Sequence, residues 1–317
     1  MKKFLRNILL FSAPILVVLF VSDFKLSKYL AKQESLDFCV GENQTWNDIF
    51  EGKMNYEIAI YGNSRAWVQI DPKIIENSTG KSCYNFGIDG QDLDIQLLRH
   101  QLYLKNNTAP KTIIYVVDFA LFDGEMSEYN YQQFLPYMFW NKEIKESTKS
   151  FTTFTFLDYY IPMLRFQNEK MLIDKATALN VKDTIGIRTQ GYKGFDKVWN
   201  TDFDNAKKDK TAITINVDEE QQLKFEAFLE DCKLKSIEVI LVVPPIYIEG
   251  QKFVLNHNSL IENLKLIAKK HQLSIFDYTK DSICMSKEMF YNAGHLNKNG
   301  AEIFTKKIVL TIQKEKN

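Results

Sequence analysis

The stretch from Tyr56 to Ala66 combines a short, mostly apolar run with the polar turn Gly62-Asn63-Ser64, and helical spacing follows it. This order is typical of an α/β protein in which a buried strand ends and a helix begins. Gly62 permits a sharp bend because it lacks a Cβ atom. Ser64 is then expected at a helix N-terminus, where free N–H groups favour negative charge. It is a candidate nucleophile, and the alternative is an ordinary strand-to-helix loop that happens to contain a serine.

The same alternation of strand and helix patterns continues along the chain. The strands are expected at residues 56–61, 82–86, 112–117, 237–243 and 273–276. The helices are expected at residues 71–80, 92–106, 219–235, 259–271 and 297–313. Nearly continuous apolar runs indicate strands buried on both faces. The sequence therefore predicts a mainly parallel sheet of about five strands with right-handed crossovers, whose site lies at the carboxyl ends of the strands.

The N-terminus has a basic start followed by an apolar segment. Lys2, Lys3 and Arg6 precede residues 7–22, which are uncharged, strongly apolar and end at Asp23. As a helix this segment spans roughly 24 Å, slightly less than the ~30 Å hydrocarbon core, and basic side chains that reach the interface extend it. No small-x-small cleavage site follows it. We predict an uncleaved, single-pass signal anchor with the rest of the chain outside the cytoplasm; a cleaved signal peptide and a buried helix are the alternatives.

The remaining chain divides into a polar connection and a main domain. We predict an anchor at residues 1–24, a stalk at 25–55 and the main domain at 56–317. In the stalk, Trp46 and Phe50 are candidate anchors onto the body. The α/β alternation breaks between about residues 123 and 216, and the first half of this stretch is rich in aromatic residues. We predict a partly helical insertion over one edge of the sheet, either a satellite hydrophobic cluster or a lid that stacks on a sugar or an acyl chain.

Charge and cysteine content exclude some classes of protein. Lysine plus arginine equals aspartate plus glutamate, at 40 each, so the chain has no basic footprint for nucleic acid. The cysteines show no C-x-x-C spacing, which gives a zinc site little support; they are Cys39, Cys83, Cys232 and Cys284. They are compatible with two disulfides in an exported chain or with four separate buried thiols.

Three short motifs lie at predicted strand ends or near the C-terminus. They are Gly62-Asn63-Ser64, the segment from Asn85 to Gly90, and the segment from Phe290 to Ala301, which contains His295-Leu296-Asn297. In this order they resemble the SGNH hydrolase superfamily. The resemblance covers nearly all of the chain from Tyr56 onward, apart from the insertion.

The resemblance implies a three-layer α/β/α sandwich and a role for each motif. Ser64 corresponds to the nucleophile, Gly90 to a donor of an oxyanion-hole N–H, and His295 to the general base. The backbone N–H of Ser64 would supply a second oxyanion donor. His295 is also the only one of the four histidines expected in a loop after the last strand. Such chemistry requires no metal and no organic cofactor.

Two positions depart from the family pattern. The residue that normally orients the histidine is an aspartate, and Asn292 stands there. An amide can hold a histidine but cannot stabilise imidazolium as a carboxylate does, and in a serine protease this change costs about 10⁴-fold in kcat. Asp277, Asp281 and Glu288 are alternative acids. At the position of the usual oxyanion asparagine stands Asp118, whose carboxylate would repel an oxyanion unless protonated.

The anchor and the variant first motif resemble one branch of the superfamily, the membrane-anchored SGNH-like proteins that act beside membrane-bound O-acyltransferases. This implies an extracytoplasmic serine O-acyl esterase or acyltransferase acting on acyl groups of a surface polysaccharide through an acylated Ser64. Its partners would be an acylated glycan or acyl donor, the membrane and a membrane-bound O-acyltransferase. The alternatives are a non-catalytic glycan-binding or assembly partner of such an acyltransferase, and a lipid or simple-ester hydrolase.

Overall fold

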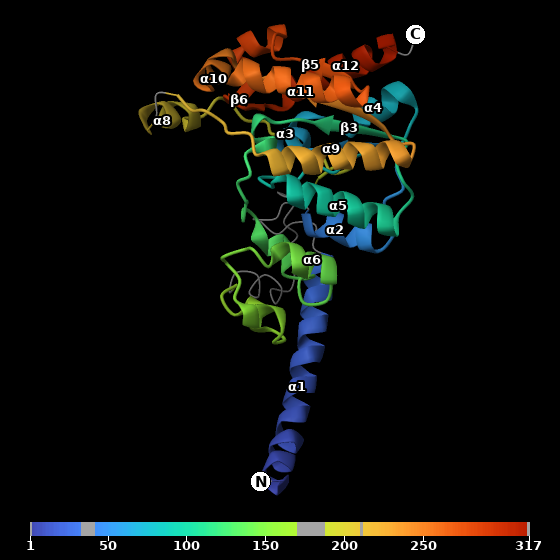
Figure 1. Cartoon of the computed structure of the whole chain (residues 1–317), viewed down its shortest axis with the longest axis vertical. Coiled ribbons are helices and arrows are strands. Elements are labelled where there is room, and N and C mark those ends of the chain that lie inside the picture. Colours follow the sequence, from blue (N-terminus) through green and yellow to red (C-terminus); the bar gives the residue numbers. More distant parts are fainter. Residues whose placement is uncertain (1, 33–41, 170–187, 210–211, 316–317) are drawn as a thin grey trace. The chain divides into compact units, whose positions relative to one another are not determined.

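The computed structural model describes residues 2–32, 42–169, 188–209 and 212–315 (Figure 1). Its contacts group the chain into two compact units. The first unit comprises Met1–Glu51 and Asn130–Ile187, and the second comprises Gly52–Tyr129 and Arg188–Asn317. The predicted insertion is therefore divided, because its middle part groups with the N-terminal segment and its last part with the sheet.

The second unit is built on a parallel five-stranded sheet in the order β2-β1-β3-β4-β5. Its strands are β1 (Ile58–Tyr61), β2 (Cys83–Asn85), β3 (Thr112–Val116), β4 (Glu238–Val243) and β5 (Ser274–Asp277). Every residue of β3 is buried, as expected of a strand covered on both faces. The predicted parallel sheet is confirmed, and each strand lies within about two residues of its predicted range.

Helices cover both faces of this sheet (Figure 1). One face packs against α3 (Ser64–Gln69), α4 (Pro72–Thr79) and α12 (Lys298–Glu315), through a core that includes Ile60, Val116 and Phe304. The other face packs against α5 (Leu93–Asn106) and α9 (Glu219–Leu234), where the rings of Tyr61 and Tyr115 contact Phe228. Beside α9 lies α11 (His257–His271), which also contacts β5. The expected three-layer α/β/α sandwich is confirmed.

Local sequence signals fix the bounds of α4. Asp71 caps its N-terminus by accepting a hydrogen bond from the backbone N–H of Lys73 at 2.9 Å. Pro72 occupies the first helical position, where its missing N–H costs nothing. Gly80 ends the helix in the left-handed region at φ 70°. The predicted helix start and stop are both confirmed.

A small antiparallel hairpin precedes α12 where the sequence predicts a loop. Its strands are β6 (Phe290–Asn292) and β7 (His295–Leu296), and Asn292 pairs directly with His295. The short helices η5 (Ser282–Met285) and η6 (Lys287–Met289) lead into it, and α8 (Asp202–Asp209) and α10 (Ile248–Phe253) complete this unit together with η1 (Phe119–Phe122). Strands of two or three residues are too short to show alternating hydrophobicity, so periodicity misses them.

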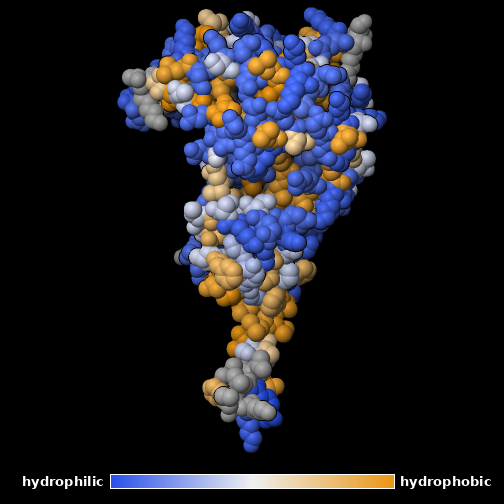
Figure 2. Space-filling view, viewed as in Figure 1, coloured by the Kyte–Doolittle hydropathy of each residue, from blue (hydrophilic) through white to orange (hydrophobic). Residues whose placement is uncertain are grey.

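The first unit contains the apolar N-terminal helix α1 (Lys2–Ala31), which continues eight residues beyond Asp23 into the predicted stalk. The segment Leu10–Ala31 is long and apolar enough to cross a membrane, a property that a signal sequence shares with an anchor. Figure 2 shows hydrophobic residues gathered along the exposed length of α1. Within the described part of this unit the other helices are α2 (Glu42–Phe50), η2 (Tyr131–Phe134), α6 (Lys142–Thr148), η3 (Phe156–Tyr159) and η4 (Leu164–Phe166).

The aromatic residues of the insertion pack mostly against one another and against the N-terminal segment. Trp46 is fully buried, donates a hydrogen bond from Nε1 to Gln133 Oε1 at 2.9 Å and contacts the ring of Phe134. Phe50 contacts Tyr137 with ring centroids 5.0 Å apart. Both predicted anchors of the stalk therefore pack onto the insertion.

Three of the four cysteines are described, and all three are free. Cys83, Cys232 and Cys284 are buried, and burial raises the pKa of each thiol. Cys39 lies outside the described residues. Since no disulfide joins the three described thiols, these residues match the interpretation as separate buried thiols.

Candidate active site

Ser64 is the first residue of α3, directly after the turn that ends β1. The Asn63 side chain caps this helix by accepting a hydrogen bond from the backbone N–H of Arg65 at 3.1 Å. Gly62 has φ 135°, and a Cβ atom there would lie 2.7 Å from the Val116 carbonyl oxygen. The turn therefore requires glycine for its backbone conformation and for its close approach to β3. The predicted placement of Ser64 at a helix N-terminus is confirmed.

His295 lies within hydrogen-bond distance of this serine. The two side chains are separated by 231 residues in sequence, yet Ser64 Oγ is 2.8 Å from His295 Nε2. His295 is the first residue of β7 in the hairpin. The ring of Tyr291 stacks on its imidazole at a centroid distance of 5.4 Å. The structure therefore brings together the predicted nucleophile and the predicted base.

Asn292 orients the imidazole from the opposite strand of the hairpin. Its Oδ1 atom accepts hydrogen bonds from the backbone N–H groups of Gly294 at 3.1 Å and His295 at 2.9 Å. Because N–H groups can only donate, the amide oxygen must face them, and it also accepts from His295 Nδ1 at 3.0 Å. Nδ1 then carries the proton, which leaves Nε2 as the acceptor for the Ser64 hydroxyl. This tautomer is the one that a general base requires.

Burial and a neighbouring cation hold His295 in its neutral form. Burial of the ring is the largest cause, Arg65 adds to it, and together they lower the pKa of His295 to about 4. Asp118 and Asp202 act in the opposite direction with a smaller effect. The imidazole is therefore available as a base at neutral pH, although it binds a proton weakly.

Asp118, which stands where the resemblance implies an oxyanion asparagine, forms an ion pair with Arg65. Its Oδ2 atom lies 3.3 Å from Arg65 Nε and accepts a hydrogen bond from Asn63 Nδ2 at 2.9 Å. Burial alone would raise the pKa of Asp118, but Arg65 and Asn63 outweigh it and the pKa lies below its ordinary value. The carboxylate is thus ionised and its charge is balanced. The expected repulsion of an oxyanion by this carboxylate is thus reduced by Arg65, the residue directly after Ser64.

Asn85 holds the segment from Asn85 to Gly90 against the Gly62-Asn63-Ser64 turn and the helix that follows it. This fully buried side chain donates hydrogen bonds to the carbonyl oxygens of Ala66 at 2.7 Å and Ile70 at 2.8 Å. The backbone N–H of Ile88 donates to the Gly62 carbonyl oxygen at 3.0 Å. The loop that carries Gly90 therefore borders the Ser64 turn. Gly90 itself has φ 65°, and the ring of Tyr129 packs where a Cβ atom would lie.

Asp202 is a neighbour of the site that sequence reasoning missed. Its Oδ2 atom accepts hydrogen bonds from Asn292 Nδ2 at 3.3 Å and from Asn200 Nδ2 at 2.6 Å. The backbone N–H of Asn200 donates to the Tyr291 carbonyl oxygen at 2.8 Å, which holds this segment against the hairpin. A carboxylate thus reaches the imidazole through the Asn292 amide. No local motif marks Asp202, because it lies 90 residues from Asn292.

The other candidate acids have partners elsewhere. Asp277 accepts hydrogen bonds from Thr279, and Asp281 forms an ion pair with Lys307 at 2.7 Å. Neither of them, nor Glu288, has a hydrogen bond to His295 among the described residues. In the same described part of the chain, no cluster of three or more histidine, cysteine, aspartate or glutamate residues is placed to hold a metal ion.

Comparisons with known proteins give remote similarities of structure and none of sequence. No family model and no curated protein matches the chain. A Bacteroides fragilis protein described provisionally as an acylhydrolase is 14% identical, with a TM-score of 0.37 over 80% of this chain and 86% of that one. A Streptococcus pneumonia protein described provisionally as a platelet activating factor is 12% identical, with a TM-score of 0.41 over 84% and 88%.

A third solved structure, a GDSL-like lipase from Bacteroides thetaiotaomicron, is 14% identical to this chain. Its TM-score is 0.36, over 80% of this chain and 88% of that one. The geometry of the site, rather than these remote similarities, supports the function proposed below.

Proposed function

We propose that the protein is a serine O-acyl esterase or acyltransferase that works through an acylated Ser64. The observation that carries this proposal is the continuous line of hydrogen bonds from Ser64 Oγ through His295 to Asn292. A serine hydroxyl is a weak nucleophile unless a base takes its proton, and here a neutral imidazole is held in the required tautomer.

The reaction would proceed in two halves. Ser64 Oγ attacks the acyl carbonyl carbon while His295 Nε2 takes the hydroxyl proton, and the same nitrogen then protonates the departing alcohol oxygen. Water or a sugar hydroxyl attacks the acyl-serine in the second half, with the proton transfers repeated. The backbone N–H groups of Ser64 and Gly90 are the proposed donors to the oxyanion, each worth on the order of 10²–10³-fold in kcat.

We propose an acylated extracytoplasmic glycan as the substrate and a membrane-bound O-acyltransferase as a partner. The apolar α1 supports a membrane location, with the basic residues of its first turns on the cytoplasmic side. Partly exposed aromatic rings beside His295 support a sugar ligand: Tyr291 stacks on the imidazole and Phe195 contacts Tyr291 at a centroid distance of 6.0 Å. The Lys197 ammonium lies 4.3 Å from the centre of the Phe195 ring.

A non-catalytic glycan-binding or assembly partner is the second candidate. Two features favour it. The Nδ1 proton of His295 is received by an amide instead of a carboxylate. The ion-paired carboxylate of Asp118 stands where the resemblance implies an oxyanion donor. A hydrolase of lipids or simple esters would use the same serine as the esterase we propose.

The test is intact-mass spectrometry of the full chain in detergent after exposure to a fluorophosphonate. We expect one adduct on the wild type and none on Ser64→Ala or His295→Ala. A folded wild type without an adduct would support the non-catalytic candidate. For a reactive protein, release of acetate from acetylated oligosaccharides, compared with cleavage of long-chain lipid esters, separates the glycan substrate from the lipid substrate.

A further inference from the structure

A buried ion pair with further hydrogen bonds joins α1 to the insertion within the first unit. The side chains of Asp23 and Arg165 are fully buried and form a two-pronged ion pair, with Nη1–Oδ2 at 2.6 Å and Nη2–Oδ1 at 2.8 Å. Asp23 also accepts hydrogen bonds from Trp140 Nε1 at 2.7 Å and from the backbone N–H of Met163 at 2.6 Å. Such pairing offsets the large cost of burying two charges and fixes one register of the insertion on α1.

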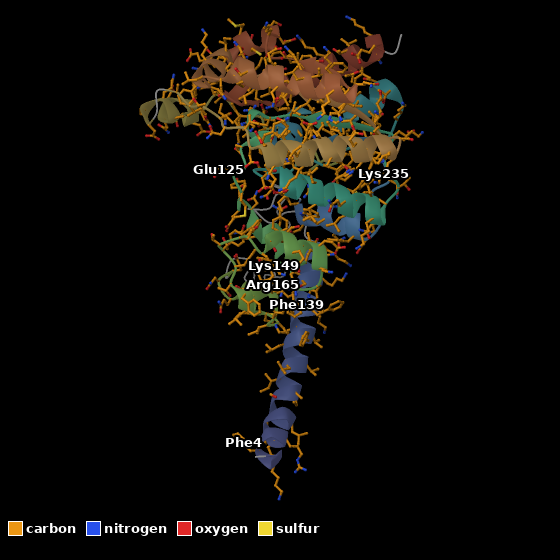
Figure 3. All side chains as sticks on the ribbon, in the orientation of Figure 1. Phe4, Glu125, Phe139, Lys149, Arg165 and Lys235 are labelled. Carbon is orange, nitrogen blue, oxygen red and sulfur yellow. The ribbon has the colours of Figure 1, made fainter. Side chains whose placement is uncertain are left out.

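Aromatic residues of the insertion pack against α1 beside this network. The ring of Trp140 contacts Phe20 and Phe24 at centroid distances of 6.3 and 5.6 Å, and Phe139 contacts Phe20 at 5.8 Å. Figure 3 shows Phe139 and Arg165 beside α1. The Lys145 ammonium joins Phe139 to Tyr160, lying 5.9 and 4.5 Å from the two ring centres.

The same surface leaves large apolar side chains in solvent. Exposed fractions are 72% for Phe156 and 50% for Tyr160, whose rings contact each other at 4.6 Å, and 44% for Trp140. We call this surface the aromatic collar, and its residues are Phe139, Trp140, Phe156, Leu157, Tyr160 and Ile161.

The collar lies where the uncharged run of α1 ends, at Asp23. Phe11, Ile15 and Val18 are 61–78% exposed, and the uncharged run ends at Asp23, one turn beyond Phe20. Tryptophan and tyrosine concentrate at the depth of lipid headgroups because one end of each side chain is apolar and the other is polar. Lys145 adds a cation that suits anionic headgroups.

We propose that the aromatic collar is a lipid-contact surface that enters the headgroup region of the outer leaflet around α1. The occupant is the bilayer itself, because the collar continues the apolar surface of the helix and begins where its uncharged run ends. This inference rests on the membrane span in the proposed function. It adds that the insertion, and not α1 alone, contacts lipid.

The test uses the full chain in vesicles of mixed phosphatidylcholine and phosphatidylglycerol. Phe156→Cys and Tyr160→Cys each carry an environment-sensitive fluorophore, and lipids with a nitroxide near the headgroup act as quencher. Leu234→Cys is the matched control, since Leu234 is an 83% exposed apolar residue outside the collar. The wild-type chain, labelled in parallel, measures any reaction of the native cysteines. Flotation of the vesicles reports membrane anchoring separately.

We expect blue-shifted emission that the nitroxide lipid quenches at positions 156 and 160, and unquenched emission at 234. Flotation without quenching at either collar position would overturn the collar and leave the anchor intact. Blue-shifted but unquenched emission would instead show that a protein, such as a second copy, covers the surface. Equal quenching at all three positions would overturn the collar, because a surface residue outside it would then contact lipid just as well. Failure to float would overturn both the collar and the anchor.

Discussion

At the scale of single residues, the proposed chemistry depends on how weakly His295 holds a proton. The pKa of about 4 follows from burial and from Arg65, and Asn292 supplies no negative charge to offset them. Above that pH the imidazole is neutral and accepts the Ser64 proton. Below it the ring is protonated and the serine loses its base.

The first prediction concerns the pH dependence of kcat/KM. We expect the rate to fall as pH decreases through about 4, instead of near the ordinary histidine value of 6.5. A pH–rate profile with an ester substrate measures this. An acid limb centred near 6.5 would show that the proposed effects of burial and Arg65 do not operate.

The second prediction restores a carboxylate at position 292. Asn292→Asp should raise the pKa of His295, but it places a second carboxylate beside Asp202, whose Oδ2 lies 3.3 Å from the amide nitrogen. The double variant Asn292→Asp/Asp202→Asn removes this repulsion while keeping a hydrogen bond possible. We expect the double variant to exceed the wild type in kcat/KM by about 10²–10⁴-fold, with the single variant in between.

Steady-state kinetics of wild type, Asn292→Asp, Asp202→Asn and the double variant form a complete cycle. The Asp202→Asn variant is the control for the loss of Asp202 alone. If the double variant gained nothing over the wild type, an amide would be as effective as a carboxylate here, and our account of the His295 pKa would need revision.

At the scale of elements, the ion pair between α1 and the insertion should behave as a unit. Removing one partner leaves a buried charge, which typically costs about 3–5 kcal/mol, whereas replacing both by apolar residues is often neutral. Arg165→Met should therefore speed protease cleavage of residues 130–169 about 150- to 5,000-fold, which is this free-energy cost converted at about 1.4 kcal/mol per tenfold. Asp23→Leu/Arg165→Met should recover most of the resistance.

Limited proteolysis of the full chain in detergent measures this, with fragments assigned by mass. The exposed ion pair Lys149–Glu146 is the matched control. Lys149→Met should change the rate of protease cleavage little, because exposed ion pairs contribute little to stability. Equal sensitivity of the single and double variants would mean that the ion pair does not act as a coupled unit.

The elements also show what the sequence could and could not predict. Apolar runs such as residues 112–117 identify the sheet. The end of the first strand leads to Ser64, and a motif in the expected loop after the last strand leads to His295. The hairpin that pairs Asn292 with His295 is too short to leave a periodic pattern. Asp202 and Arg165 acquire their partners only through tertiary structure, across 90 and 142 residues respectively. Asp23 marks the end of an apolar run in sequence, and only the fold reveals its buried cation.

At the scale of the whole molecule, buried neutral histidines link folding to pH. Burial lowers the pKa of both His100 and His295 to about 4, whereas both rings titrate near 6.5 in an unfolded chain. Between these values the unfolded chain holds protons that the folded chain does not. The free energy of unfolding should therefore fall as pH decreases from 6.5 to 4.

The prediction is tested by denaturant unfolding across this pH range. His100→Gln can keep a hydrogen bond to the Tyr61 hydroxyl, which lies 3.0 Å from His100 Nδ1, but does not titrate. We expect the free energy of unfolding of this variant to fall less steeply as pH decreases, because its unfolding takes up one proton fewer. An unchanged slope would mean that His100 titrates alike in both states.

The separation of Asp23 and Arg165 in sequence also determines when their ion pair can form during translation. At about 5–20 residues per second, the ribosome needs roughly 7–30 s to make the 142-residue interval between them. The segments that form β1, β2 and β3 are translated during that interval. The first three strands of the sheet are therefore synthesised before the first unit can fold completely. During this period Asp23 has no Arg165 with which to form its ion pair. The two units are thus made in an interleaved order, and the one that begins first depends on a residue translated near the middle of the chain.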